Sequence, residues 1–389
     1  MPDSPKILIC SGDASGDLIA ADFVRALRRH CPDAHFFGIG GDQMQEEGVE
    51  LLVHQRDLAV GLLDIFSSLH RIIGAWFRLS RALREEKPDL VVLVDSPDFN
   101  LPFARKAAGS GVPILYYVSP QVWAWRRGRI AKIARRVDRL AVIFPFEKEL
   151  YLGTGLHVDF VGHPLIDRIS RFREGNGRAA CRAALGLDAE APLLLVMPGS
   201  RRNEIKHCLA PFLETARLFH AQHPEVHMVL SVAPTIDRAR VEEGIRLAAL
   251  PESLHMDIIQ GRSYDLIRAA DLALAKPGTS TMELAIFGCP FVVSGKTTRF
   301  TYLVSRCVLH LRALAMPNLI AGRHIVPELL QDEADPARIA EALSQLLQGP
   351  AREKQQRELA AVTESLGDGG AAEQTAIIAE EMICVSAQK

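Results

Sequence analysis

The segment Leu90–Asn100, with the sequence LVVLVDSPDFN, constrains the fold more than any other part of the chain. Its first five residues are apolar and mostly valine, which is typical of a strand buried on both faces of a parallel sheet. The run ends at Asp95, and Pro97 stiffens the turn that follows. Because open α/β sheets bind ligands at the carboxyl ends of their strands, the segment predicts an α/β fold with Asp95 at a ligand site.

Two carboxylates in this turn are candidates for proton transfer. Asp95 is the candidate general base, and Asp98 is its rival. The alternative is that either carboxylate only caps the helix that follows. The turn taken by itself leaves both interpretations open.

Length and composition restrict the class of protein. With 389 residues the chain is too long for one ordinary core and predicts two domains of similar size. A net charge of −2 does not favour nucleic-acid binding. The seven cysteines show no paired spacing, so neither a disulfide framework nor a zinc site is indicated, and a reducing, cytoplasmic compartment fits. No signal peptide and no transmembrane helix are predicted.

A glycine-rich turn follows the first predicted strand, Lys6–Ser11. The sequence from Ser11 to Asp17 is SGDASGD, and an amphipathic helix is predicted from Leu18 to His30. Such a turn offers backbone N–H groups to an anion, but Asp13 and Asp17 are equally able to cap the helix. The glycines lack the spacing of a dinucleotide fingerprint, so a nicotinamide cofactor has little support.

Two basic segments contain the three tryptophans. Ile65–Leu83 predicts an amphipathic helix that carries Trp76 and several arginines. Trp123, Trp125 and Arg126 begin a second run, which is rich in Arg and Lys. One interpretation is a helix packed on its sheet with a solvated face, and the other is contact with an anionic membrane surface.

The charged segment Arg168–Gly177 predicts the linker between the domains, because it contains two glycines and lacks apolar periodicity. The predicted domains are residues 1–168, residues 178–350 and a helical C-terminal segment, 351–389, that packs back across them. A second set of alternating strands and helices begins at Leu193–Met197.

Two turns of the second domain are candidates for phosphate binding. Gly199, Ser200 and Arg201 form a plausible diphosphate clamp, because backbone N–H groups and a guanidinium both address phosphate oxygens. A second anion site is predicted where Gly278, Thr279, Ser280 and Thr281 precede a helix. Together they predict a nucleotide diphosphate site, and the alternative for Arg201 is an exposed side chain in a turn.

Glu283 lies in the first turn of the helix that follows Gly278–Thr281. It is a candidate ligand of a ribose, because its carboxylate can accept hydrogen bonds from two adjacent hydroxyls. Its alternative role is helix capping.

Several motifs, taken together and in order, resemble those of lipid-A-disaccharide synthases. The resemblance covers nearly the whole chain and rests on these motifs: Ser15-Gly16-Asp17, Phe37-Gly38-Ile39-Gly40-Gly41, Asp95-Ser96-Pro97-Asp98-Phe99-Asn100, Val118-Ser119-Pro120-Gln121-Val122-Trp123-Ala124-Trp125-Arg126, Phe144-Pro145-Phe146-Glu147, Phe160-Val161-Gly162-His163-Pro164, Pro198-Gly199-Ser200-Arg201 and Pro317-Asn318-Leu319.

The resemblance implies a GT-B fold, two Rossmann-like α/β domains that face each other across a cleft. It also implies inverting transfer of 2,3-diacylglucosamine from UDP-2,3-diacylglucosamine to 2,3-diacylglucosamine 1-phosphate, without a metal or cofactor. The product is the β-1,6-linked disaccharide 1-phosphate, and UDP is released. An enzyme of this kind works at the cytoplasmic face of the inner membrane, in contact with phospholipid, and the resemblance leaves a homodimer open.

Site residues follow from the resemblance by position. Asp95 is the implied base. The implied UDP ligands are Arg201, the turn at 278–281, Glu283 and Asn318. Asp13 and Asp98 complete the catalytic candidates, and the acceptor and membrane side is assigned to Ser15, Gly16, Trp76, Trp123, Trp125 and Arg126.

The chain departs from the usual family pattern near both sites. Asp13 stands where Glu is usual, Gln121 replaces Ser, the loop at Gly61 is shorter, and Lys276-Pro277 replaces small residues. These departures leave open a divergent relative with another UDP-sugar or acceptor, or a non-catalytic UDP-sugar-binding protein. A UDP-sugar 2-epimerase of the same fold is a further alternative, but it gives the tryptophan-arginine segment no purpose.

Overall fold

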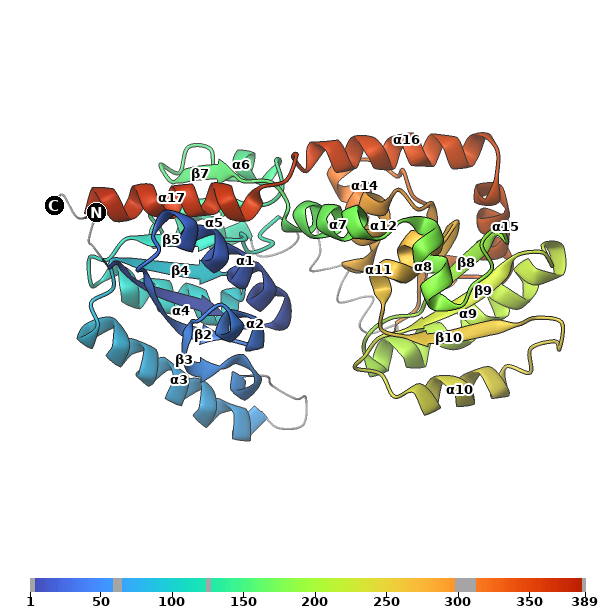
Figure 1. Ribbon diagram of the computed structural model, residues 1–389, viewed down its shortest axis with the longest axis horizontal. Coiled ribbons are helices and arrows are strands. Elements are labelled where there is room, and N and C mark those ends of the chain that lie inside the picture. The colour runs from blue at the N-terminus through green and yellow to red at the C-terminus, as the bar shows by residue number, and fades with distance from the viewer. Residues whose placement is uncertain (1–3, 59–64, 124–126, 298–312, 387–389) are drawn as a thin grey trace. The chain divides into compact units, whose positions relative to one another are not determined.

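The computed structural model describes residues 4–58, 65–123, 127–297 and 313–386 (Figure 1). These residues form two compact units, Met1–Pro164 with Leu366–Lys389, and Leu165–Ser365. Each unit is a parallel sheet with interleaved helices, so the predicted α/β fold is confirmed.

The first unit contains a seven-stranded sheet with the order β3-β2-β1-β4-β5-β6-β7. Its strands are β1 (Lys6–Ser11), β2 (His35–Gly40), β3 (Glu50–His54), β4 (Leu90–Val94), β5 (Ile114–Tyr117), β6 (Arg139–Val142) and β7 (His157–Phe160). Its helices are α1 (Ala14–His30), α2 (Asp42–Glu46), α3 (Ile65–Glu85), α4 (Pro97–Ala108), α5 (Ile130–Ala134), α6 (Glu147–Leu150) and α17 (Ala371–Ser386), with 3-10 turns at Gln55–Leu58 and Arg127–Arg129.

The central strand β4 confirms the first prediction from the sequence. All five of its residues are buried, because the sheet is covered by helices on both faces. β4 pairs in parallel with β1, and Val94 lies opposite Ser11. The order of the strands reverses between these two, so their carboxyl ends form the topological switch point where such sheets bind ligands.

The second unit contains a six-stranded sheet with the order β10-β9-β8-β11-β12-β13. Its strands are β8 (Leu193–Met197), β9 (His227–Val232), β10 (Met256–Gln260), β11 (Leu272–Ala275), β12 (Phe291–Gly295) and β13 (Glu328–Leu330). Its helices are α7 (Pro164–Gly175), α8 (Arg178–Leu185), α9 (Arg202–Gln222), α10 (Arg238–Leu247), α11 (Ser263–Ala269), α12 (Ser280–Phe287), α14 (Met316–Ala321), α15 (Pro336–Leu347) and α16 (Pro350–Ser365), with a 3-10 turn at Gln331–Glu333. The switch point of this sheet lies between β8 and β11.

The segment predicted as a linker is helical. Helix α7 runs from Pro164 to Gly175 and buries Ile169 completely, while the ring of Phe172 contacts the rings of Tyr264 and Phe287. The apolar pattern of α7 begins before Arg168, so a window that starts at that residue loses the periodicity. The compact units divide between Pro164 and Leu165, whereas the sequence places the end of the first domain at residue 168.

The last two helices belong to different units. Helix α16 packs in the second unit, where the Gln355 side chain exchanges hydrogen bonds of 2.8 and 3.2 Å with the backbone of Phe291. Helix α17 packs along α1 in the first unit (Figure 1), and His30 contacts Glu373 at 2.7 Å and Glu380 at 3.0 Å. The C-terminal segment therefore returns to the first unit.

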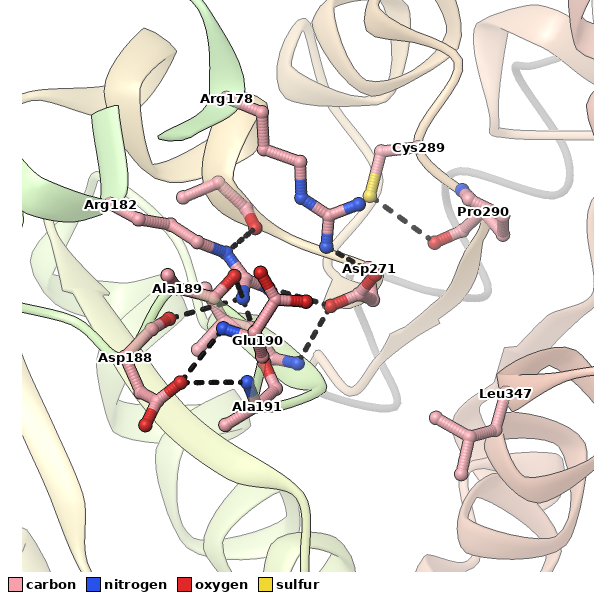
Figure 2. A network of polar contacts seen from close by, with 12 residues as sticks. Arg178, Arg182, Asp188, Ala189, Glu190, Ala191, Asp271, Cys289, Pro290 and Leu347 are labelled. Atoms are coloured by element: carbon pink, nitrogen blue, oxygen red, sulfur yellow. Dashed lines mark hydrogen bonds and ion pairs between the residues drawn. The ribbon is translucent and has the colours of Figure 1, made fainter. Parts of the chain in front are cut away.

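The buried side chain of Arg182 ties α8 to the amino end of the second sheet (Figure 2). Its guanidinium donates to Asp271 at 2.8 Å, and Asp271 also accepts the N–H of Leu193, the first residue of β8, at 2.9 Å. The other hydrogen bonds of Arg182 go to backbone carbonyls, those of Asp188, Ala189, Ala191 and Ala269. The buried guanidinium of Arg182 therefore has a hydrogen-bond acceptor for each of its three nitrogens.

Replacing Arg182 with methionine is expected to lower the free energy of unfolding of the second unit by about 3–5 kcal/mol, because it leaves a partly buried carboxylate and several carbonyls without their donor. Arg178→Met is the matched control. Arg178 also pairs with Asp271 but is exposed, so its loss should cost about 0–1 kcal/mol.

The two units offer separate readouts for this test. All three tryptophans lie in the first unit, so fluorescence reports that unit, whereas amide hydrogen exchange in β8 and β11 reports the second. Equal loss of protection in the two variants would contradict a structural role specific to Arg182.

Candidate active site

A strained turn presents Asp95 at the switch point of the first sheet. Asp95 and Ser96 both have φ of +44°, a left-handed conformation that residues other than glycine seldom adopt. Consecutive residues of this kind persist only where their surroundings hold them, and such strain is concentrated at functional sites.

Hydrogen bonds from two side chains hold the turn in place. Asn100 donates from Nδ2 to the carbonyl oxygens of Asp95 at 2.8 Å and Val94 at 3.0 Å. The hydroxyl of Tyr116, a fully buried residue of β5, donates to the same Asp95 oxygen at 2.6 Å. The backbone of Asp95 is thereby anchored by one residue of α4 and one of β5.

The turn after β1 packs against this anchored turn. The N–H of Gly12 donates to Ser96 Oγ at 3.1 Å. A Cβ at position 12 would lie 2.5 Å from the same oxygen, so only glycine permits the approach. The two switch-point turns therefore form one hydrogen-bonded assembly.

The acidity of Asp95 is altered by its surroundings. Burial raises the pKa of its carboxyl, and the negative charge of Asp13 raises it further, to about 6. A carboxyl of this kind is ionised at neutral pH and is a stronger proton acceptor than an ordinary aspartate.

Asp13 and Asp17 both bind backbone N–H groups. Asp13 is the N-cap of α1, where it accepts the N–H of Gly16 at 2.7 Å. Asp17 is buried and accepts the N–H groups of Gly41 at 2.6 Å and Gln43 at 3.1 Å. The capping interpretation is therefore confirmed for Asp13, whereas Asp17 lies within α1 and binds N–H groups at the start of α2 instead. Asp13 still lies close enough to act on Asp95.

The rival carboxylate, Asp98, lies in the first turn of α4 with an exposed side chain. It is paired with Arg129 at 2.5 Å. Asp98 is therefore held by a cation, whereas Asp95 is the more buried carboxylate at the switch point.

The predicted acceptor and membrane residues have mixed environments. Ser15 is exposed in the first turn of α1, and Gly16 is buried. Trp76 is half-buried against Phe103, with ring centroids 5.9 Å apart, and Trp123 is buried against Phe146 at 5.5 Å. Both tryptophans pack into the first unit, whereas Trp125 and Arg126 lie outside the described residues, as does the loop at Gly61.

The second unit has a cavity of ≈ 160 Å³ at its own switch point, between the turns that follow β8 and β11. Its lining residues are Met197, Gly199, Ser200, Ser231, Ala233, Ser263, Lys276, Gly278, Thr279, Ser280 and Glu283. The structure thus brings both predicted phosphate turns and Glu283 to one cavity.

Glycine is required in both turns of this cavity. Gly199 has φ of +130° and Gly278 has φ of +159°, which L side chains rarely adopt. The Thr281 hydroxyl closes the second turn by donating to the Gly278 carbonyl at 2.7 Å. Glu283 is half-buried, and burial raises the pKa of its carboxyl, although Arg168 opposes the shift.

Two predicted donor ligands do not line the cavity. Arg201 is the N-cap of α9, and its side chain is 84% exposed. Asn318 is buried with its amide bonded to the segment that leads into β13, since it donates to the Val326 carbonyl at 2.9 Å and accepts the N–H of Ile325 at 2.7 Å. Their roles as UDP ligands stay predictions.

Glu204, in the first turn of α9, was not among the residues predicted for the site. Its carboxylate accepts the N–H groups of Ser200 at 2.9 Å and Arg201 at 3.1 Å and pairs with Lys276 at 2.8 Å. An acidic residue three positions after a helix N-cap is typical of a capping box, so the position of Glu204 in the sequence could have indicated its contacts with the turn. In the part of the chain that the structure describes, no group of three or more His, Cys, Asp or Glu side chains is arranged to hold a metal ion.

Comparisons with known proteins agree with the two-unit architecture. A UDP-GlcNAc 2-epimerase from Neisseria meningitidis, solved bound to UDP-GlcNAc, has a TM-score of 0.65 and covers 97% of this chain and 99% of that chain. MurG from Acinetobacter baumannii has a TM-score of 0.61 and covers 98% and 100%. Each is 14% identical to this chain, so the likeness shows the fold, which is GT-B.

Sequence comparisons identify the family. The family model described as lipid-A-disaccharide synthetase matches residues 7–382. The lipid-A-disaccharide synthase of Anaeromyxobacter dehalogenans strain 2CP-1 is 42% identical over 368 residues, 94% of each chain. That of Syntrophus aciditrophicus is 39% identical over 383 residues, 98% of each chain. The chain therefore belongs to the lipid-A-disaccharide synthase family of glycosyltransferases.

Proposed function

We propose that the chain transfers 2,3-diacylglucosamine from UDP-2,3-diacylglucosamine to the 6-hydroxyl of 2,3-diacylglucosamine 1-phosphate, with inversion at the anomeric carbon. The observation that carries the proposal is Asp95, a half-buried carboxylate held in a strained turn at the switch point with a pKa of about 6. The family of the chain supports the same reaction.

In the proposed mechanism Asp95 is the general base. Its carboxylate takes the proton of the acceptor 6-hydroxyl while the hydroxyl oxygen attacks the anomeric carbon of the donor. The bond from that carbon to the diphosphate breaks, and its electron pair leaves with UDP. Attack from the side opposite the diphosphate gives a β-1,6 linkage.

The cavity of the second unit is the proposed donor site. The turn before α12 places Gly278, Thr279 and Ser280 at the positive end of the helix dipole, which favours a diphosphate. Glu283 lines the same cavity and offers its carboxylate to the ribose hydroxyls. The same dipole and N–H groups stabilise the charge that develops on the departing UDP.

The exposed face of α3 is the proposed contact with the inner membrane. Ile73 is 46% and Phe77 67% exposed, and the arginines of the same helix include Arg71 and Arg78, whose side chains are also exposed. Apolar side chains beside cations favour the interface of an anionic bilayer. No helix among the described residues is long and apolar enough to cross a membrane. We propose this contact as a peripheral one at the cytoplasmic face, where the acylated substrates would be presented.

The proposed function predicts that purified protein releases UDP from UDP-2,3-diacylglucosamine only when 2,3-diacylglucosamine 1-phosphate is present. Asp95→Asn should reduce this release on the order of 10²- to 10⁴-fold, because the general base is lost. The affinity for UDP should stay unchanged, since Asp95 acts on the acceptor. Release is measured together with chromatographic detection of the disaccharide.

Asp98→Asn is the matched control and should keep most of the activity. Loss of activity in Asp98→Asn but not in Asp95→Asn would transfer the role of base to Asp98. Binding of UDP without release by the wild-type protein would contradict the transferase and favour a UDP-sugar-binding relative.

The pKa of Asp95 predicts an acid limb in the pH profile of UDP release. The base must be ionised, so activity should fall as the pH falls through about 6. Asp13→Asn removes a charge that raises this pKa, so the limb should move to lower pH. Asn is also a good N-cap, so α1 should keep its start. An acid limb at the same pH in both proteins would contradict this coupling.

The ionised carboxylate of Asp95 should also lower the free energy of unfolding. The folded-state pKa of about 6 exceeds the ordinary value of 3.8, so the destabilisation is complete above pH of about 6 and absent below 3.8. Asp95→Asn should therefore raise the free energy of unfolding near pH 7.5 by about 3 kcal/mol at most, and asparagine tolerates the left-handed backbone. Urea unfolding followed by tryptophan fluorescence measures the effect. Stabilisation that is as large at pH 3.5 as at pH 7.5 would contradict an electrostatic origin.

A further inference from the structure

Lys276 extends between the two glycine turns of the donor cavity. A Cβ built on Gly278 would lie 3.3 Å from its Cε and Nζ, and a Cβ built on Gly199 would lie 3.2 Å from its Cδ. The side chain is only 20% exposed and lines the cavity. Its ammonium is therefore placed where the diphosphate of a donor would be held by the two turns.

Glu204 neutralises this ammonium in the structure. One carboxylate oxygen pairs with Lys276 Nζ at 2.8 Å, and the other accepts the N–H groups of Ser200 and Arg201. Burial raises the pKa of Glu204, but the bond to Lys276 and the two N–H groups outweigh burial and hold the pKa below its usual range. Glu204 thus supplies a negative charge to the groups that the first turn would offer to phosphate.

We propose that Lys276 is a ligand of the donor diphosphate and that Glu204 is the internal anion that occupies the ammonium until the donor binds. The inference rests on the proposed function, which makes the ligand of this cavity a nucleoside diphosphate. A lysine ammonium has three donors on a flexible stem, so it turns from a carboxylate to a phosphate oxygen without a change in the backbone.

The geometry favours Lys276 over Arg201 for this role. Arg201 was the cation expected from the sequence, but its side chain is 84% exposed and does not line the cavity. A charge-assisted hydrogen bond is stronger when water is excluded from it. The partly buried ammonium of Lys276 should therefore contribute more to the affinity for diphosphate than the exposed guanidinium.

The test is calorimetric titration of the full chain with UDP and with uridine, which lacks the diphosphate. Lys276→Met should weaken UDP binding by about 10- to 100-fold, the equivalent of one charge-assisted hydrogen bond, and leave uridine binding unchanged. Lys276→Arg should recover most of the affinity. Unchanged uridine binding also shows that the variant is folded around its cavity.

Lys296→Met is the matched control. Lys296 lines a neighbouring cavity of ≈ 530 Å³ but not the donor cavity, so its loss should change neither titration. Wild-type affinity for UDP in Lys276→Met, or an equal loss for UDP and uridine, would overturn the role of Lys276 and leave the proposed function standing. Failure of the wild-type protein to bind UDP would overturn both.

A second variant tests the part assigned to Glu204. Glu204→Gln keeps an oxygen that can accept the N–H groups of the turn but removes the competing charge, so UDP should bind several-fold more tightly. The gain should be smaller in a Lys276→Met background, because part of it comes from releasing the ammonium. Weaker or unchanged UDP binding in Glu204→Gln would overturn the competition between carboxylate and diphosphate.

Discussion

The hydrogen bonds to the carbonyl of Asp95 are the constraint on which the catalytic proposal depends. Two consecutive left-handed residues are unfavourable by themselves, and the hydrogen bonds from Asn100 and Tyr116 to the Asp95 carbonyl offset this cost. Asn100 lies in α4, directly after the turn, and Tyr116 lies in β5, so the position of the carboxylate follows from the start of α4 and from the register of β4 with β5. Gly12 completes the arrangement, because only a residue without a Cβ lets the neighbouring turn approach Ser96.

In both units, carboxylates of the chain itself accept N–H groups of helix starts and turns. In the first, the carboxylates of Asp13 and Asp17 take backbone N–H groups near the start of helices, and the charge that remains raises the pKa of Asp95. In the second, Glu204 takes the N–H groups and Lys276 compensates its charge. Helix starts and glycine turns are thus satisfied by internal carboxylates, since an unsatisfied buried donor is costly.

The parts of this protein that sequence predicts are those set by local patterns. The apolar run of β4 determines a buried parallel strand, and the carboxyl ends of β4, β8 and β11 then determine where ligand groups gather. The sequence does not predict which groups a polar side chain contacts once the chain is folded. The role of Asn318 at the nucleotide stays a prediction, and its amide contacts the Ile325 and Val326 backbone and the Glu328 side chain, which no local pattern predicts.

Both proposed sites contain a carboxylate whose negative charge opposes a step of the proposed reaction. The charge of Asp13 opposes ionisation of Asp95, so in the proposed mechanism the transfer of a proton to Asp95 relieves that repulsion. The charge of Glu204 near the donor cavity opposes an incoming diphosphate unless the ammonium of Lys276 changes partner. The charge of Glu204 therefore opposes the binding of a diphosphate, while its carboxylate holds the N–H groups of Ser200 and Arg201. The proposed change of partner at Lys276 needs a ligand that supplies a matching negative charge, which favours a diphosphate over neutral analogues.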